Sequence, residues 1–111
     1  MLAQAARLRT ADEFRTTLRR GVRCARPTLV LHMMRTDNPP SRAGFVVSKA
    51  VGGAVVRNRV KRRLRALMAA RLTTLPRGCD VVLRANPGSA HATYAELSAD
   101  LERQLAAVLR S

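Results

Sequence analysis

The chain has 111 residues, 47% of them hydrophobic, so its length permits one domain, residues 1–111, with a single modest core. Lys and Arg number 21 against 7 Asp and Glu, which gives a net charge of +14 at pH 7. Such a charge indicates an acidic partner, and a nucleic acid fits best. An anionic membrane surface is disfavoured, because the chain has no Trp to anchor a basic helix at a lipid interface.

Targeting and metal-binding signals are weak. Residues 1–8 contain no apolar segment of signal-peptide length, and no uncharged stretch approaches a membrane span, so we expect a soluble cytoplasmic protein. Cys24 and Cys79 lie far apart with no His or Cys at metal-ligand spacing, so neither a disulfide framework nor a zinc site is indicated. We expect both cysteines to be small buried apolar residues.

The first element in chain order is a helix. Thr10 and Glu13 form a capping-box pattern that predicts a helix to about residue 20, where Gly21 ends it. Phe14 and Leu18 then lie one turn apart on one helix face.

Extended segments and a loop follow this helix. The first strand with apolar residues on both sides is expected to be central in a sheet, and the next to form a hairpin with it. Gly52 and Gly53 then give a sharp turn into a second helix, whose first backbone amides could hold a phosphate. The alternative is that the two glycines only permit the turn. The expected segments are a short extended piece at 22–25, strands at 28–34 and 43–48, and a loop at 36–41.

The second helix is strongly basic. Residues 57–65 carry six Lys or Arg and no acidic residue, although a surface helix usually interleaves Glu or Asp to relieve repulsion. Apolar residues recur at helical spacing through the same segment, so we predict a helix from about Ala54 to Leu72, not a disordered tail. The expected buried stripe is Val56, Val60, Leu64, Leu67 and Met68, with Asn58, Arg62 and Arg65 on the opposite side and Arg59 and Lys61 on the shoulders.

The last part of the chain predicts a strand at 80–84 and a terminal helix, which Thr93 and Glu96 open with a second capping box. Glu96 and Asp100 share a face of that helix with Arg103, which favours an exposed ion-pair surface over a metal site. The order α-β-β-β-α-β-α predicts an α/β (α+β) two-layer sandwich with a small mixed sheet. For a strand, helix and strand crossover, a right-handed connection is the default.

A resemblance to a known family follows from these residues. Arg42-Ala43-Gly44-Phe45-Val46-Val47-Ser48-Lys49, Val51-Gly52, and Arg57-Asn58-Arg59-Val60-Lys61-Arg62 resemble the protein subunit of bacterial ribonuclease P, whose signature is the Arg-Asn-Arg box followed by Lys-Arg. The N-terminal part fits too, with Leu8-Arg9, residues 12–14 and Arg20-Gly21. The resemblance implies a left-handed crossover around the basic helix, contrary to the default.

The resemblance also implies a function. The chain would be the protein component of an endoribonuclease that removes the 5′ leader of precursor tRNA and leaves a 5′-phosphomonoester on the mature end. The RNA subunit would carry the chemistry and the magnesium, while the protein would bind no cofactor or metal, supply no catalytic residue and be inactive alone. The sequence agrees, because His32 and His91 show no nucleophile or carboxylate partner. We expect a monomer within the ribonucleoprotein and no membrane partner.

Two sets of binding residues are carried over from the family. Contacts with the RNA subunit would neutralise phosphates, and the amide of Asn58 would add hydrogen bonds. A cleft for the single-stranded leader would lie between the first helix and the sheet, where an aromatic ring can stack on a base. Leu18 and His32 stand where the family often has aromatic residues, which predicts weaker stacking. The RNA-binding set is Lys49, Arg57, Asn58, Arg59, Lys61, Arg62 and Arg65, and the leader set is Phe14, Leu18, His32, Val46 and Ser48.

The main alternative is a non-enzymatic RNA-binding protein of ribosomal or ribosome-assembly type. It would show the same charge and the same small α/β domain. A DNA-binding helical protein fits less well, because no helix-turn-helix pairing or dimer seam is visible.

Overall fold

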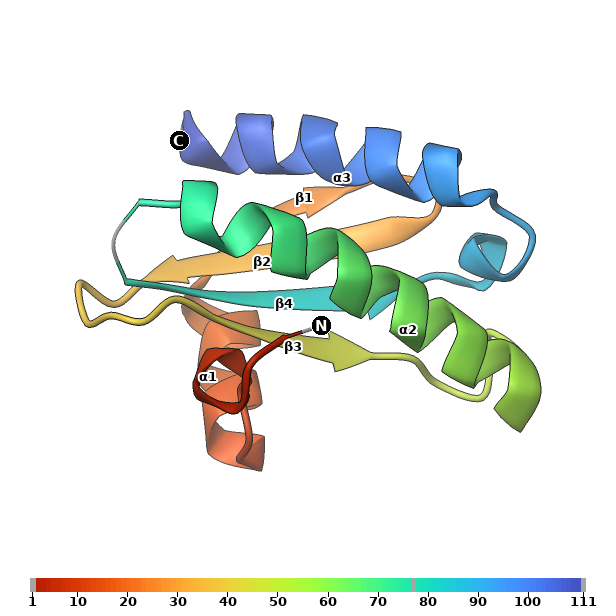
Figure 1. Cartoon of the computed structure of the whole chain (residues 1–111), viewed down its shortest axis with the longest axis horizontal. Helices are drawn as coiled ribbons and strands as arrows, with labels where there is room; N and C mark the ends of the chain where they lie inside the picture. Colours follow the sequence, from red (N-terminus) through yellow and green to blue (C-terminus); the bar gives the residue numbers. More distant parts are fainter. Residues whose placement is uncertain (1, 77, 111) are drawn as a thin grey trace.

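The computed structural model describes residues 2–76 and 78–110, and it confirms the predicted mixed α/β fold. Helices α2 and α3 cover one face of a four-stranded sheet, and α1 crosses the other face (Figure 1). In chain order the elements, with η for a short 3-10 helix, are η1 (Gln4–Ala6), α1 (Ala11–Arg20), β1 (Val22–Ala25), β2 (Leu29–Arg35), β3 (Arg42–Val46), α2 (Ala54–Arg71), η2 (Leu72–Thr74), β4 (Cys79–Ala85), η3 (Pro87–Ala90) and α3 (Tyr94–Leu109).

The sheet order β1-β2-β4-β3 shows that the predicted hairpin between the strands at 28–34 and 43–48, which are β2 and β3, is wrong. β4 lies between β2 and β3, antiparallel to β2 and parallel to β3. The reason is burial: β2 and β4 each carry five consecutive buried residues and take the two central positions, whereas β3 is partly exposed and lies at an edge. The β3-α2-β4 connection is therefore a parallel crossover, and its left-handed sense stays a prediction.

The loop after β2 carries the chain away from that strand. The backbone N–H groups of Thr36 and Asp37 both donate to Gly78 O, at 2.7 and 3.1 Å, so the loop wraps over the start of β4. Gly78 has a φ of 73°, and a Cβ there would collide with the backbone of Asp37 and Asn38. A glycine is therefore required for this loop to close over β4.

The core lies between the sheet and helices α2 and α3. The predicted stripe of α2 is confirmed, since Val60, Leu64, Leu67 and Met68 are buried and Val56 packs against them. Both predicted capping boxes are present, at Thr10 with Glu13 and at Thr93 with Glu96. Of the two cysteines, Cys79 is buried and Cys24 is half-buried against the core.

Asp100 corrects part of another expectation. Its ion pair with exposed Arg103 is present, with Nη1 4.0 Å from Oδ1, but Asp100 itself is buried, and its Oδ2 accepts a hydrogen bond from Thr28 Oγ1 at 2.6 Å. Arg26 Nε also donates to it, at 3.4 Å, so α3 is tied to the turn between β1 and β2.

In the two stretches that the structure describes, we find no helix that combines the length and the apolar character required to cross a bilayer.

Candidate nucleic-acid interface

The outer face of α2 is the most basic helical surface. Asn58 and Arg62 are exposed there as predicted, and Lys61 and Arg65 are half-buried beside them. Together with Val55 they line a shallow hollow of about 550 Å³. Because no acidic residue lines it, this hollow is suited to a phosphate backbone.

Two arginines in the middle of α2 are partly engaged within the protein. Arg59 Nη2 donates to Ala90 O at 3.0 Å, and Arg63 Nη1 donates to Ala92 O at 3.1 Å, so one turn of α2 is tied to the connection between β4 and α3. This anchoring role of Arg59 was not predicted. Its contact with RNA stays a prediction, as does that of half-buried Arg57.

The start of α2 is electropositive. Gly53 is the N-cap residue and, having no side chain, cannot cap the backbone amides, and the first turn contains no acidic residue. Gly52 has a φ of 156°, and its N–H donates to Lys49 O at 3.2 Å, which confirms the predicted turn. Exposed Lys49 therefore precedes a helix end whose backbone amides favour an anion.

The sheet face opposite α2 and α3, here called the open face, carries the predicted leader-binding residues. The strand register places His32, Val82 and Gly44 in one row across β2, β4 and β3. The next row contains Val30, Arg84 and Val46. Because side chains alternate along a strand, these two rows face the same side, toward α1.

Phe14 joins α1 to this face. A Cβ built on Gly44 would overlap the Cε2 and Cζ atoms of the Phe14 ring, so the ring lies directly on the glycine. Phe14 also lines a small groove of about 120 Å³ at the edge of β3, which Lys61 and Arg65 reach from α2. The basic face of α2 and the aromatic ring of α1 therefore border one continuous surface around β3.

His32 is buried, with 4% of its surface exposed, and neither ring nitrogen has a hydrogen-bond partner among the described residues. Burial lowers the pKa of His32, and the positive charges of Arg84 and Arg23 lower it further. The imidazole is therefore neutral at pH 7, with one N–H donor and one nitrogen acceptor unused.

Of the five residues predicted for the leader cleft, three meet on the open face: Phe14, His32 and Val46. Leu18 is half-buried one turn after Phe14, and Ser48 is exposed in the loop after β3. Their contact with a leader stays a prediction.

Sequence reasoning missed the exposed residues Arg84 and Arg23, whose charges act on His32. Arg84 follows Val82 by two residues, so the predicted strand already placed both side chains on one face of the sheet. Only the observed register shows that Arg84 lies between Val30 and Val46 in its row.

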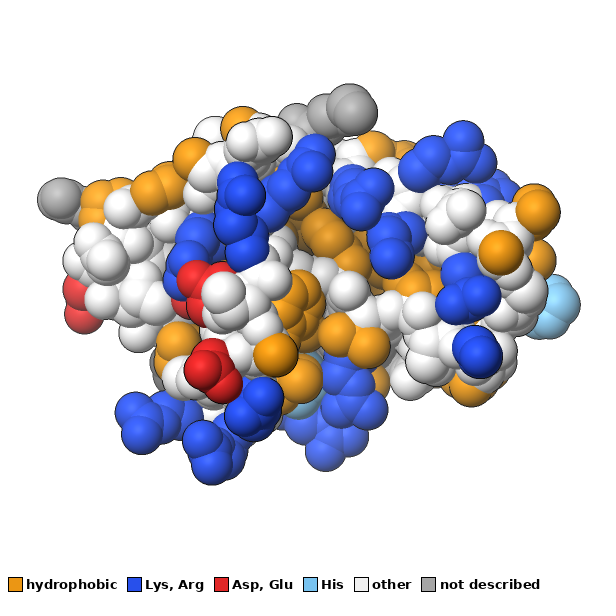
Figure 2. All heavy atoms as spheres, turned by 90° about the horizontal axis from the view of Figure 1, so that it is seen from below, with side chains coloured by type: hydrophobic (Ala, Val, Ile, Leu, Met, Phe, Trp, Pro, Cys, Tyr) orange, Lys and Arg blue, Asp and Glu red, His pale blue; other side chains and the backbone are white. Residues whose placement is uncertain are grey.

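Figure 2 views the molecule from the side of α1 and β3, and shows exposed apolar side chains near the middle of this surface. Lys and Arg side chains gather around them, whereas acidic side chains occupy only small areas. In the strand register, Val46 lies beside Arg84 on the open face, and 36% of its surface is exposed. An apolar floor bordered by cations is suited to unpaired bases and their phosphates.

Within residues 2–76 and 78–110, no three His, Cys, Asp or Glu side chains come together in a group that could hold a metal ion. The fold and the charge distribution instead define a basic α/β protein of the nucleic-acid-binding class.

Comparison with known proteins identifies the family. A family model described as Ribonuclease P matches residues 2–109. The ribonuclease P protein component of Streptomyces bikiniensis is 52% identical over 118 residues, covering 98% of this chain and 96% of its own length. That of Beutenbergia cavernae is 57% identical over 106 residues, covering 95% and 89%. The chain belongs to the ribonuclease P protein family, which confirms the resemblance and disfavours the ribosomal alternative.

Solved structures show the same fold. The ribonuclease P protein of Staphylococcus aureus superposes with a TM-score of 0.81 at 24% identity, over 96% of this chain and 94% of that protein. The protein from Thermotoga maritima gives a TM-score of 0.78 at 23% identity, over 89% and 94%. The unusual placement of β4 between β2 and β3 therefore lies within a fold that this family shares.

Proposed function

We propose that this chain binds the catalytic RNA of a bacterial ribonuclease P through the outer face of α2, and the 5′ leader of precursor tRNA through the open face beside α1. It would act as one RNA-binding domain of the cytoplasmic holoenzyme. The observation that supports this division best is the continuous surface around β3, where a helix face without acidic residues meets an apolar, Arg-bordered sheet face.

On α2, closely spaced cations would neutralise phosphates of the folded RNA and release counterions. The RNA could then hold its own magnesium at lower salt, and the side chains of this protein would serve as phosphate contacts. Arg62 and Asn58 are the most exposed members of this set, and the amide-rich start of α2 near Lys49 would extend the contact.

On the open face, a leader nucleotide would stack on Phe14, while Arg84 and Arg23 contact its phosphates. Because mature tRNA lacks the leader, these contacts would favour binding of the precursor and release of the product. Single substitutions should therefore change substrate binding more than the chemical step.

Two charge reversals test this division of labour. Arg62→Glu should weaken binding of the RNA subunit, whereas Arg84→Glu should leave that binding unchanged and weaken the holoenzyme's affinity for precursor tRNA but not for mature tRNA. Arg110→Glu, at the exposed end of α3, makes the same change in net charge and is the control. If Arg84→Glu lowered the affinity of the holoenzyme equally for precursor and mature tRNA, the assignment of the open face to leader binding would be wrong.

A further inference from the structure

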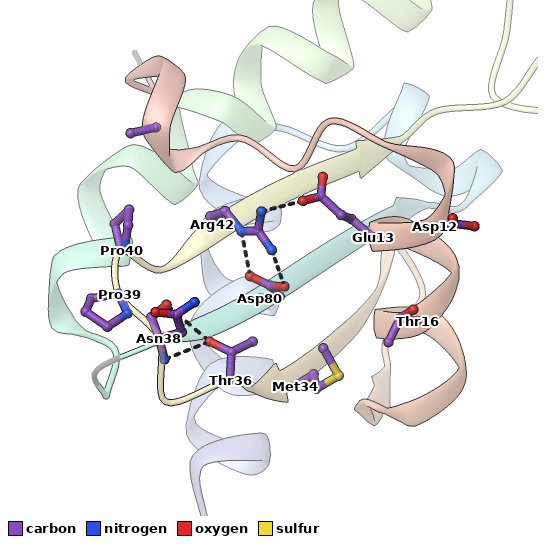
Figure 3. Close-up of a pocket in the computed structure, with 11 residues that line it drawn as sticks. Asp12, Glu13, Thr16, Met34, Thr36, Asn38, Pro39, Pro40, Arg42 and Asp80 are labelled. Atoms are coloured by element: carbon purple, nitrogen blue, oxygen red, sulfur yellow. Dashed lines mark hydrogen bonds and ion pairs between the residues drawn. The ribbon is translucent and has the colours of Figure 1, made fainter.

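A partly buried ionic network ties α1 to two strands of the sheet. Arg42, the first residue of β3, donates from Nε and Nη2 to the two carboxylate oxygens of Asp80 on β4, at 3.1 and 2.9 Å. Its Nη1 donates to Glu13 Oε2 on α1 (Figure 3). Asp80 is buried, and this two-pronged contact gives each of its carboxylate oxygens a hydrogen-bond donor.

Glu13 serves the helix and the network together. Its Oε1 accepts hydrogen bonds from the backbone N–H groups of Arg9 and Thr10, at 2.8 and 2.9 Å, while its other oxygen meets Arg42. The hydrogen bonds from Thr10 and Arg9, followed by the Arg42 contact, lower the pKa of Glu13 to about 2. One ionised carboxylate therefore fixes the first turn of α1 to the start of β3.

Helix α1 buries fewer residues against the sheet than the other two helices do, so apolar packing alone fixes its position only weakly. Thr17 is the single buried residue of α1, whereas α2 buries four residues and α3 buries six. Beside the network, a cavity of about 640 Å³ opens between α1 and the loop after β2, lined among others by Thr16, Met34 and Asn38. Without the ionic contact, the helix would have room to shift.

The network lies next to the candidate leader cleft. Phe14 follows Glu13 in α1, and Gly44, on which the Phe14 ring lies, is two residues after Arg42 on the same face of β3. The ionic contact and the ring contact therefore attach α1 to β3 at two adjacent points. A half-buried ion pair such as Arg42–Glu13 adds little net stability compared with apolar packing, but its geometry is specific, which suits a positioning role.

We propose that Arg42 and Glu13 are positioning residues for leader binding, which hold α1 so that Phe14 borders a cleft already formed before the precursor tRNA arrives. This inference rests on the proposed leader-binding function of the open face. Neither residue would touch the RNA in this role. Its effect would reach the leader through Phe14.

Glu13→Gln is the mildest test, because the amide oxygen can still close the capping box while the charge opposite Arg42 is lost. In the reconstituted holoenzyme, its preference for precursor over mature tRNA should fall by about tenfold, the order of one stacking contact. Affinity for mature tRNA and for the RNA subunit should stay unchanged. Asp12→Asn is the matched control, since Asp12 neighbours Glu13 but forms its ion pair with exposed Arg15 and not with Arg42.

Arg42→Lys is the second variant. It keeps a cation beside Asp80 but loses the fork that also reaches Glu13, so it should show the same selective loss. A merely structural defect would instead weaken binding of the RNA subunit and of both tRNAs together, which would overturn the inference. An unchanged precursor preference in both variants would overturn it as well.

Phe14→Ala separates this inference from the proposed function. If Phe14→Ala lowers the precursor preference, Glu13→Gln should cost nothing further in that background, because the positioned ring is gone. If Phe14→Ala matters and Glu13→Gln does not, the positioning role is wrong while leader binding stands. If Phe14→Ala has no effect on the preference, the leader-binding function itself is wrong.

Discussion

Adding one methyl group at Gly44 should displace the Phe14 ring. The Cβ of a Gly44→Ala variant would overlap ring atoms Cε2 and Cζ, and it would lie 3.2 Å from Leu8 Cβ, so space is short on both sides. The φ of Gly44 is not in the left-handed region, so alanine fits the backbone and the effect comes from the methyl group. Overpacking of this kind costs about 1–3 kcal/mol of stability.

The displaced ring should also cost leader affinity. One lost stacking platform is worth about 1–3 kcal/mol, or about 5- to 150-fold in the Kd of the holoenzyme for precursor tRNA. Equilibrium binding of precursor and mature tRNA measures this change, and urea unfolding of the protein measures the stability. Adding Phe14→Leu should relieve the overlap and recover stability without recovering precursor affinity. If Gly44→Ala changed neither the stability nor the Kd for precursor, the ring would not lie on Gly44 as described.

Three further predictions concern α2 and Glu13. Arg62→Ala should lower affinity for the RNA subunit and reduce the slope of log K against log salt concentration by about one. Arg63→Ala, which loses a hydrogen bond to Ala92 O, should mainly lower the stability of the protein, and equal salt slopes for the two variants would contradict this division. Leu64→Ala should lower the free energy of unfolding by about 2–5 kcal/mol, because Leu64 is fully buried, and a loss well below that range in urea unfolding would contradict its place in the core. Since the folded-state pKa of Glu13 is lowered to about 2 from 4.5, the stability that its ionised form contributes is present above pH 4.5 and is lost as the pH falls toward 2. The free energy of unfolding should therefore depend less on pH across this range in Glu13→Gln, and an unchanged dependence would contradict the ionised contact.

Local signals predicted the elements well, because the residues that define them are neighbours in the chain. Both capping boxes place helix starts correctly, and the stripe around Val60 and Leu64 places the core face of α2. The strand pairing was wrong because it depends on a segment 38 residues away: Asp80, not a residue of β2, is the register partner of Arg42. A short loop favours a hairpin, but the burial of β4 on both faces outweighs that preference.

The candidate binding surfaces likewise contain residues that local patterns place and residues that only tertiary structure places. The outer face of α2 follows from helical spacing, so Asn58 and Arg62 could be placed from the sequence. The anchoring of Arg59 on Ala90 O depends on where the connection before α3 lies, and the row containing Arg84 depends on the sheet register. These are tertiary facts that no periodicity encodes.

Multiple-turnover cleavage of a 5′-labelled precursor tRNA at low magnesium tests the central claim most directly. The RNA subunit alone, the RNA subunit with this protein, and the protein alone are compared. We predict efficient cleavage at the mature 5′ end only when both components are present, and none with the protein alone. Cleavage by RNA alone at the same rate as with the protein, or cleavage by the protein alone, would contradict the account.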